Sequence, residues 1–212
     1  MGDFKLLIFD LDETLYARGS GVMAEIGRRI QRWLVEQFDL AWDEAVRLRR
    51  QYYQRYGTTL GGLVAEHEVD VDHYLVYVHD ISLERYLQPN LALAAMLERL
   101  PMRKSIYTNA SAAHARRVLR ALDVAEHFER VVGIEEVGLL NKPEPRAYDR
   151  ALDLLGAEGS TAVMVEDSAR NLRPAKALGM TTILVDGPSA PWVDYVVDDV
   201  LDVGDVIDRH CG

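Results

Sequence analysis

The sequence predicts an α/β protein, a doubly wound parallel-sheet core with a small all-helical domain inserted after the first strand. Several short, mostly apolar runs lack the alternation of half-exposed strands, which is typical of parallel strands covered on both faces. Helical patterns follow most of these runs, as crossover helices would. A long stretch of helical periodicity interrupts the alternation once, directly after the first run, and therefore predicts the insert.

The elements of the core are expected in the order strand, helix, strand. The expected strands cover residues 4–9, 104–108, 130–133, 162–165 and 182–185. The expected crossover helices cover residues 111–122, 145–155 and 171–178. Pro145 suits a first helical turn, Gly156 and Gly179 suit helix ends, and Asn171 is expected to cap the third helix. Residues 194–208 are expected to add an edge strand and a short terminal helix.

The insert shows helical periodicity and no strand-like run. Its amphipathic helices are expected at residues 23–38, 43–56 and 70–79. The chain is therefore expected to form two domains. They are an α/β core from residues 1–15 and 89–212, and a helical domain from residues 16–88.

The net charge and the apolar content of the sequence limit the kinds of partner that the chain is expected to bind. Asp and Glu number 34 against 24 Lys and Arg, a formal charge of −10, which argues against a broad nucleic-acid or anionic-membrane surface. No apolar run approaches the roughly 20 residues of a membrane span. The single cysteine, Cys211, suits a reducing compartment, so a cytoplasmic protein is expected.

His67, His73 and His79 are six residues apart, which does not suit a zinc helix. The oligomeric state stays open.

Polar side chains follow the strand-like runs. The first run leads into DLDET (residues 10–14), the second into Thr108 and Asn109, and the fourth into EDS (residues 166–168). The loop after the third run contains NKP (residues 141–143). Ligands bind at the carboxyl ends of the strands in an open parallel sheet, so these side chains are expected to converge.

The converging groups suit a phosphate site that depends on a cation. Two carboxylates about 4 Å apart repel by roughly 4 kcal/mol at an effective dielectric near 20. Asp10, Asp12, Glu166 and Asp167 offer only oxygen ligands, for which Mg²⁺ is the expected ion. Lys142 supplies a second positive charge, and backbone N–H groups after the second strand are expected to hold further phosphate oxygens.

Two neighbouring acids suit different chemical tasks. Asp10, beside the metal and the phosphorus, is expected to be a nucleophile that forms an aspartyl-phosphate. Asp12 is expected to give a proton to the leaving oxygen and later to take one from water. Thr14 is expected to fix the turn between them by bonding back to the backbone. Each motif alone also fits a turn or a helix cap, and their joint placement favours a functional site.

Four motifs, FDLDETL (9–15), YTN (107–109), KPEP (142–145) and EDS (166–168), resemble in order those of the haloacid dehalogenase superfamily. The match spans essentially the whole chain, and it implies a Rossmann-like core with the insert as a C1-type cap. The resemblance also implies that Asp10 is the nucleophile and Asp12 the general acid and base. Thr108 and Lys142 would stabilise the phosphate. The implied Mg²⁺ ligands are Asp10, the Asp12 carbonyl and Asp167, assisted by Glu166.

Two features of the first motif qualify this resemblance. Superfamily members that cleave carbon–halogen bonds lack an acid at the position of Asp12, so phosphoryl transfer is implied. Glu13 departs from the family pattern, since many relatives carry Asn or Gly there.

Three further segments, YGTTL (56–60), VHDI (78–81) and DSARNL (167–172), resemble the pyrimidine 5′-nucleotidase branch. This implies a pyrimidine nucleoside 5′-monophosphate, such as UMP or CMP, as the small phosphorylated metabolite. The substrate-binding residues expected on this basis are Asn109, Tyr56, Thr58, Thr59, His79 and Asp80.

Three alternatives remain. A related phosphatase or phosphomutase would act on another small metabolite, such as phosphoglycolate or a sugar phosphate. A phosphoacceptor signalling domain is disfavoured, because such domains place the acceptor aspartate after the third strand and lack a large insert. A catalytically silent binding protein is disfavoured because all four motifs are intact.

Overall fold

The structure, a computed structural model, describes residues 4–211 and divides into two compact units. The first, the core unit, comprises Met1–Arg18 and Leu87–Gly212. The second, the helical unit, comprises Gly19–Tyr86. The boundaries of these units fall within three residues of the domain limits expected above.

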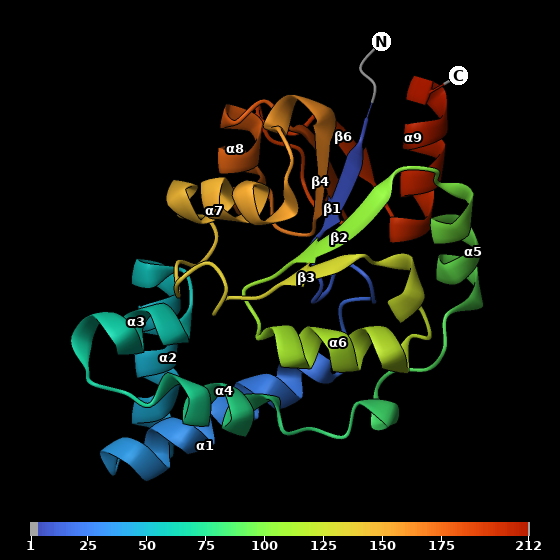
Figure 1. Ribbon diagram of the computed structural model, residues 1–212. Coiled ribbons are helices and arrows are strands. Elements are labelled where there is room, and N and C mark those ends of the chain that lie inside the picture. The colour runs from blue at the N-terminus through green and yellow to red at the C-terminus, as the bar shows by residue number, and fades with distance from the viewer. Residues whose placement is uncertain (1–3, 212) are drawn as a thin grey trace. The chain divides into compact units, whose positions relative to one another are not determined.

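The core unit is built on a six-stranded parallel sheet with the strand order β3-β2-β1-β4-β5-β6 (Figure 1). The strands are β1 (Leu6–Phe9), β2 (Arg103–Tyr107), β3 (Arg130–Val132), β4 (Ala162–Glu166), β5 (Thr181–Val185) and β6 (Tyr195–Val197). The chain starts in the middle of the sheet, fills one side with β2 and β3, and then fills the other side. This arrangement confirms the predicted doubly wound core.

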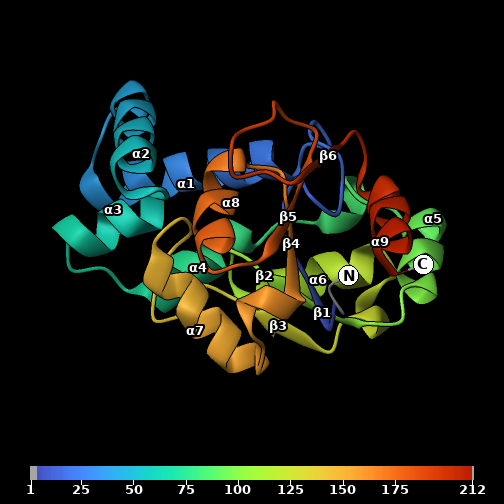
Figure 2. The same ribbon diagram turned by 90° about the horizontal axis from the view of Figure 1, so that it is seen from above.

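Helices cover both faces of the sheet, as Figure 2 shows. One face carries α7 (Pro145–Leu155) and α8 (Ala169–Ala177), and the other carries α5 (Leu91–Arg99), α6 (Ala112–Ala121) and α9 (Val203–Cys211). Short 3₁₀ turns complete the core unit at Ala125–His127, Gly159–Thr161 and Val200–Asp202. Because both faces are covered, every side chain of β1 is buried, which explains its unbroken apolar run.

The register of the sheet decides which residues meet at its carboxyl edge. Phe9 pairs with Ile106 of β2 and with Val165 of β4. The residue after β1, Asp10, therefore lies level with the last residues of its two neighbours, Tyr107 and Glu166. Polar groups distant in sequence are thus brought to one edge.

Helix boundaries follow the capping residues, with one correction. The first and last residues of α7 match the expected range, and Gly156 ends the helix in the left-handed region at φ 59°. The expectation that Asn171 caps the next helix is wrong. Ser168 is the N-cap of α8, and the Asn171 N–H already donates to the Ser168 carbonyl inside the first turn.

The helical unit contains four α-helices, α1 (Val22–Phe38), α2 (Trp42–Tyr56), α3 (Thr59–Glu66) and α4 (Val71–His79), and a 3₁₀ turn at Leu83–Arg85. The helix α3 was not predicted, and it contains Gly61 and Gly62, residues of low helix propensity. The structure explains Gly62, since a Cβ there would lie 2.2 Å from the buried ring of Tyr52. Thr58 begins the helix by accepting a hydrogen bond from the Gly61 N–H at 2.9 Å.

The helix α5 was also not predicted. Asn90 caps it by accepting a hydrogen bond from the Leu93 N–H at 3.0 Å, and its buried side chains include Leu93 and Leu97. An Asn ahead of an apolar run was the available signal.

Across residues 4–211, no helix combines the length and the apolar character needed to cross a membrane.

Candidate active site

The centre of the site is a buried ammonium group held between two carboxylates. Lys142 Nζ lies 2.6 Å from Asp10 Oδ1 and 2.6 Å from Glu166 Oε2. The side chains of Lys142 and Glu166 are each 1% exposed, and that of Asp10 is 8% exposed. The three groups come from the end of β1, the loop after β3 and the end of β4, so the structure brings these predicted residues together.

Backbone and amide groups fix the position of the lysine. Lys142 Nζ also donates to the Tyr107 carbonyl at 3.1 Å. The side chain of Asn109 holds the Lys142 backbone at both polar groups, since its Oδ1 accepts from the Lys142 N–H at 2.7 Å and its Nδ2 donates to the carbonyl at 3.2 Å. The sequence suggested Asn109 as a substrate contact, and the structure gives its side chain this positioning task.

Burial sets the protonation of the cluster. It raises the pKa of Asp10 to about 6, although the Lys142 ammonium acts in the opposite direction. Burial and the neighbouring Asp10 raise the pKa of Glu166 well above its ordinary value. Burial alone would lower the pKa of Lys142, but the two carboxylates outweigh it and raise that pKa. The lysine is therefore charged, and the two carboxyls beside it resist ionising together unless a further cation is bound.

The acidic groups fit a divalent cation. One oxygen from each of Asp10, Glu166 and Asp167 lies within 4.8 Å of the other two. Ligand oxygens around an octahedral Mg²⁺ with bonds of about 2.0–2.1 Å lie about 3 to 4 Å apart, so small movements would close the set. An all-oxygen, mainly carboxylate donor set is the kind that suits Mg²⁺.

An arginine that the sequence analysis missed lies beside this set. Arg18 Nη2 donates to Asp167 Oδ2 at 2.6 Å and to the Asp167 carbonyl at 2.8 Å. Arg18 Nε lies 3.8 Å from Glu13 Oε2. Glu13 has a φ of 63°, in the left-handed region that suits Gly or Asn better than Glu. Only the basic character of Arg18 near several acids could have suggested its place.

Asp12 has contacts with two residues that the sequence analysis also missed. Tyr16 Oη donates to Asp12 Oδ1 at 2.5 Å. His114 Nε2 lies 3.4 Å from the same oxygen. Burial, followed by the charge of Asp12, raises the pKa of Tyr16, which keeps its hydroxyl a neutral donor. No motif connects these residues, because His114 is 102 positions from Asp12.

Hydroxyl groups and helix ends complete the edge. Thr14 Oγ1 donates to Asp10 Oδ2 at 3.1 Å, so its side chain binds the carboxylate rather than only the turn. Thr108 is 2% exposed, and its Oγ1 accepts from the Ala110 N–H at 3.0 Å. The helices that follow β2 and β4 begin after Ser111 and Ser168, so their N-termini follow strand ends at this edge. Such N-termini favour anions.

The substrate contacts expected in the helical unit have local contacts there. Thr58 is a helix cap, and Thr59 and His79 are 6% and 8% exposed. Tyr56 Oη donates to Glu66 Oε1 at 2.6 Å. Asp80 Oδ2 lies 3.4 Å from Arg29 Nη2. These contacts place the side chains within the helical unit and leave their substrate role a proposal.

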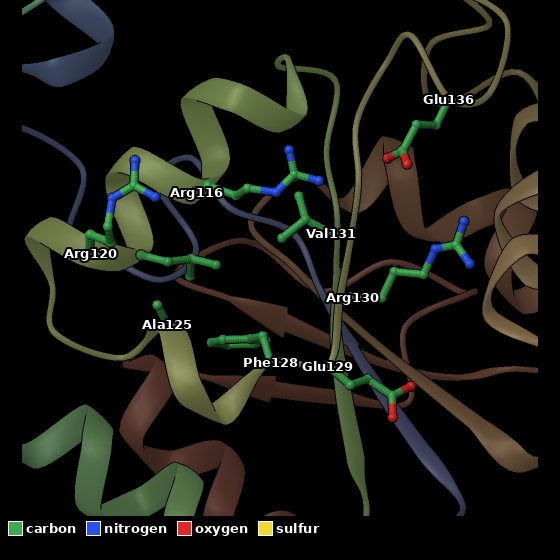
Figure 3. A pocket seen from close by; sticks show the side chains of 9 residues that line it. Arg116, Arg120, Ala125, Phe128, Glu129, Arg130, Val131 and Glu136 are labelled. Atoms are coloured by element: carbon green, nitrogen blue, oxygen red, sulfur yellow. The ribbon is translucent and has the colours of Figure 1, made fainter.

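A hollow of about 460 Å³ lies on the core unit beside α6 and β3 (Figure 3). It is lined by Arg116, Leu119, Arg120, Ala125, Phe128, Glu129, Arg130, Val131 and Glu136. None of these lining residues is a site residue expected from the sequence. We place the candidate active site at the strand ends, where nucleophilic, acidic and cationic groups meet.

Known proteins resemble this chain in sequence and in fold. A family model described as haloacid dehalogenase-like hydrolase matches residues 4–179. Phosphate metabolism protein 8 of Saccharomyces cerevisiae is 28% identical over 85% of this chain and 61% of its own length, so the chain spans less than two thirds of that relative. A glyceraldehyde 3-phosphate phosphatase of Methanopyrus kandleri is 26% identical over 85% of this chain and 83% of its own length.

Solved structures share the fold over nearly the whole chain. A HAD phosphatase from Thermococcus onnurineus has a TM-score of 0.68 at 21% identity, covering 96% of this chain and 98% of that one. An L-2-haloacid dehalogenase from Xanthobacter autotrophicus has a TM-score of 0.61 at 18% identity, covering 97% of this chain and 98% of that one. At these identities the likeness shows the fold alone, so the chemistry has to come from the site.

The raised carboxyl pKa values predict a stability that falls with pH when divalent cations are removed. The pKa of Asp10 is about 6 in the folded state, against 3.8 without burial. The protonated carboxyl therefore contributes to the free energy of unfolding fully below about pH 4, and this contribution is lost as pH rises through about 6. With EDTA present, Asp10 and Glu166 should together lower the free energy of unfolding by about 1 to 3 kcal/mol between about pH 5 and pH 7.5. Urea unfolding at the two pH values measures this loss.

The control for this measurement is Asp10→Asn, which removes one titrating carboxyl and should flatten the pH dependence. Added Mg²⁺ should flatten it in the wild-type protein as well, because the ion favours ionised carboxylates. If the free energy of unfolding of Asp10→Asn depended on pH as steeply as that of the wild-type protein, the raised pKa would not belong to Asp10.

Proposed function

Since the chain belongs to the haloacid dehalogenase-like hydrolases, we propose that it is a Mg²⁺-dependent phosphomonoester hydrolase that works through an aspartyl-phosphate intermediate. The observation that carries this proposal is the Asp10 carboxylate, 2.6 Å from the Lys142 ammonium within a cluster of three acids. One site thus offers a nucleophilic oxygen, a fixed cation and ligands for a divalent ion, the groups that phosphoryl transfer uses.

The reaction has two displacements at phosphorus. In the first, an Asp10 carboxylate oxygen bonds to phosphorus, the ester P–O bond breaks, and the leaving oxygen takes the proton of the Asp12 carboxyl. In the second, the Asp12 carboxylate takes a proton from water, whose oxygen bonds to phosphorus as the Asp10–phosphorus bond breaks. Inorganic phosphate leaves, and both aspartates return to their starting states.

The remaining residues hold the phosphoryl group and the ion. Lys142 offsets charge on Asp10 and on the transferring group, and Thr108 adds a hydroxyl at the end of β2. The proposed ligands of Mg²⁺ are the carboxylates of Asp10, Glu166 and Asp167 and the carbonyl of Asp12. The bound ion supplies positive charge to the phosphoryl oxygens.

Asp12 favours phosphate esters over organic halides as substrates, a choice that the fold leaves open. A halide ion leaves without a proton, whereas the alkoxide of an ester is a strong base that requires one. Asp12 follows Asp10 at the same strand end, and its carboxyl is held by a phenol at 2.5 Å. A placed acid of this kind suits an ester substrate.

Replacing the nucleophile tests the proposal directly. Asp10→Asn should lower kcat for p-nitrophenyl phosphate with Mg²⁺ by at least about 10⁴-fold, since loss of a nucleophile removes the covalent route. EDTA should abolish wild-type turnover, and excess Mg²⁺ should restore it. Asp149→Asn, at an exposed position on α7, is the matched control and should keep full activity. Near-normal turnover by Asp10→Asn would show that the nucleophile is wrongly assigned.

The proposed substrate class is a pyrimidine nucleoside 5′-monophosphate, selected by the helical unit acting as a cap. The segments YGTTL, VHDI and DSARNL support it through their likeness to the pyrimidine 5′-nucleotidase branch. A second candidate is a small organic phosphate, because similar proteins are named phosphoglycolate phosphatase and glyceraldehyde 3-phosphate phosphatase.

A substrate panel distinguishes these candidates. UMP and CMP should show kcat/KM at least about tenfold above phosphoglycolate, glyceraldehyde 3-phosphate and sugar phosphates, a preference of about 1.4 kcal/mol in transition-state binding. AMP and GMP serve as matched controls for the base. A higher kcat/KM for phosphoglycolate or glyceraldehyde 3-phosphate would favour the second candidate.

A further inference from the structure

Two side chains contact one oxygen of the proton-transferring carboxyl proposed above. Tyr16 Oη lies 2.5 Å and His114 Nε2 lies 3.4 Å from Asp12 Oδ1. We propose that Tyr16 and His114 are positioning residues that fix the orientation in which the Asp12 carboxyl exchanges a proton with the leaving group and with water. This inference rests on the proposed phosphatase function.

The side chains that make these contacts are largely shielded from solvent. Tyr16 is 6% exposed, the His114 side chain is 0% exposed, and the Asp12 side chain is 15% exposed. The terminal torsion of an aspartate is broad, so a carboxyl without fixed partners samples many orientations. Contacts to Oδ1 from two side chains restrict this torsion and so the direction in which the carboxyl presents its proton. General acid catalysis needs that direction, because the proton must lie on the line to the leaving oxygen.

The two side chains reach Asp12 from separate parts of the core unit. Tyr16 follows Asp12 by four residues, in a helical turn where the Leu15 N–H donates to the Leu11 carbonyl at 3.0 Å. His114 stands in the first turn of α6, where its N–H donates to Ser111 Oγ at 3.2 Å. The carboxyl is therefore fixed relative to both β1 and β2, the strands that carry Asp10 and Thr108.

A purely structural role for Tyr16 is the competing explanation, since a buried phenol needs a hydrogen-bond partner. The two roles differ in what they do to substrates with different leaving groups. A misdirected acid slows esters whose leaving alcohol needs the proton, and it spares esters whose leaving group departs as a stable anion. General disturbance of the fold would slow both alike.

The test compares kcat/KM for benzyl phosphate and p-nitrophenyl phosphate in Mg²⁺-loaded protein. Both probes carry one aromatic ring, but benzyl alcohol is a far weaker acid than p-nitrophenol. Tyr16→Phe should lower kcat/KM about tenfold for benzyl phosphate and less than about threefold for p-nitrophenyl phosphate, as loss of one hydrogen bond to a charged group implies. kcat/KM is the proper measure because it reports the step in which the leaving group departs.

Two further variants separate the donor from the packing. His114→Leu should show the same selective loss, and His114→Gln, which can present an amide N–H, should recover part of it. The matched control is Tyr195→Phe, which removes the phenol of another Tyr–His pair in the core unit, where Tyr195 Oη lies 2.7 Å from His210 Nε2. This control should leave the ratio of the two kcat/KM values unchanged.

The outcomes are distinct. Equal losses for the two probes, or no loss for either, in Tyr16→Phe and His114→Leu would overturn the positioning role while leaving the phosphatase function intact. If Tyr16→Phe does not fold by circular dichroism, the two His114 variants decide the question. Absence of wild-type turnover with both probes would instead overturn the proposed function and this inference together.

Discussion

The site depends on one buried ammonium group shared by two carboxylates. Removing Lys142 would leave Asp10 and Glu166 buried without a counter-charge, at a cost of about 3 to 5 kcal/mol for a broken buried pair. The lysine does not neutralise the cluster, because Asp167 adds a third carboxylate close to the other two. A buried ion pair is weak support for stability, so three carboxyl groups this close together are better explained by a ligand that brings positive charge.

The parallel sheet makes this arrangement possible. β1 lies between β2 and β4, so the residue that follows it has polar neighbours on both sides (Figure 1). Lys142 reaches Asp10 across 132 positions of sequence because the loop after β3 returns over this edge. Asn109 secures that loop by binding the Lys142 backbone at both polar groups. The fold thus supplies position, and a few side chains supply the chemistry.

The strands and the acidic residues that directly follow them could be predicted from the sequence. The apolar runs gave the strands, and the acids after them gave Asp10, Glu166 and Asp167. Features that depend on tertiary contact could not. The helix α3 contains Gly62 because a ring from a neighbouring helix fills the place of its side chain, and no local propensity shows that. Tyr16 and His114 meet at Asp12 only after folding.

The central claim is that an Asp10 oxygen becomes bonded to phosphorus during turnover. Acid quenching in the steady state, followed by borohydride reduction, converts an aspartyl-phosphate to homoserine, which peptide mass spectrometry locates. The account predicts homoserine at position 10 in samples quenched during turnover of p-nitrophenyl phosphate with Mg²⁺ and its absence without substrate. Sustained turnover without homoserine at position 10, or with the label at another aspartate, would contradict it.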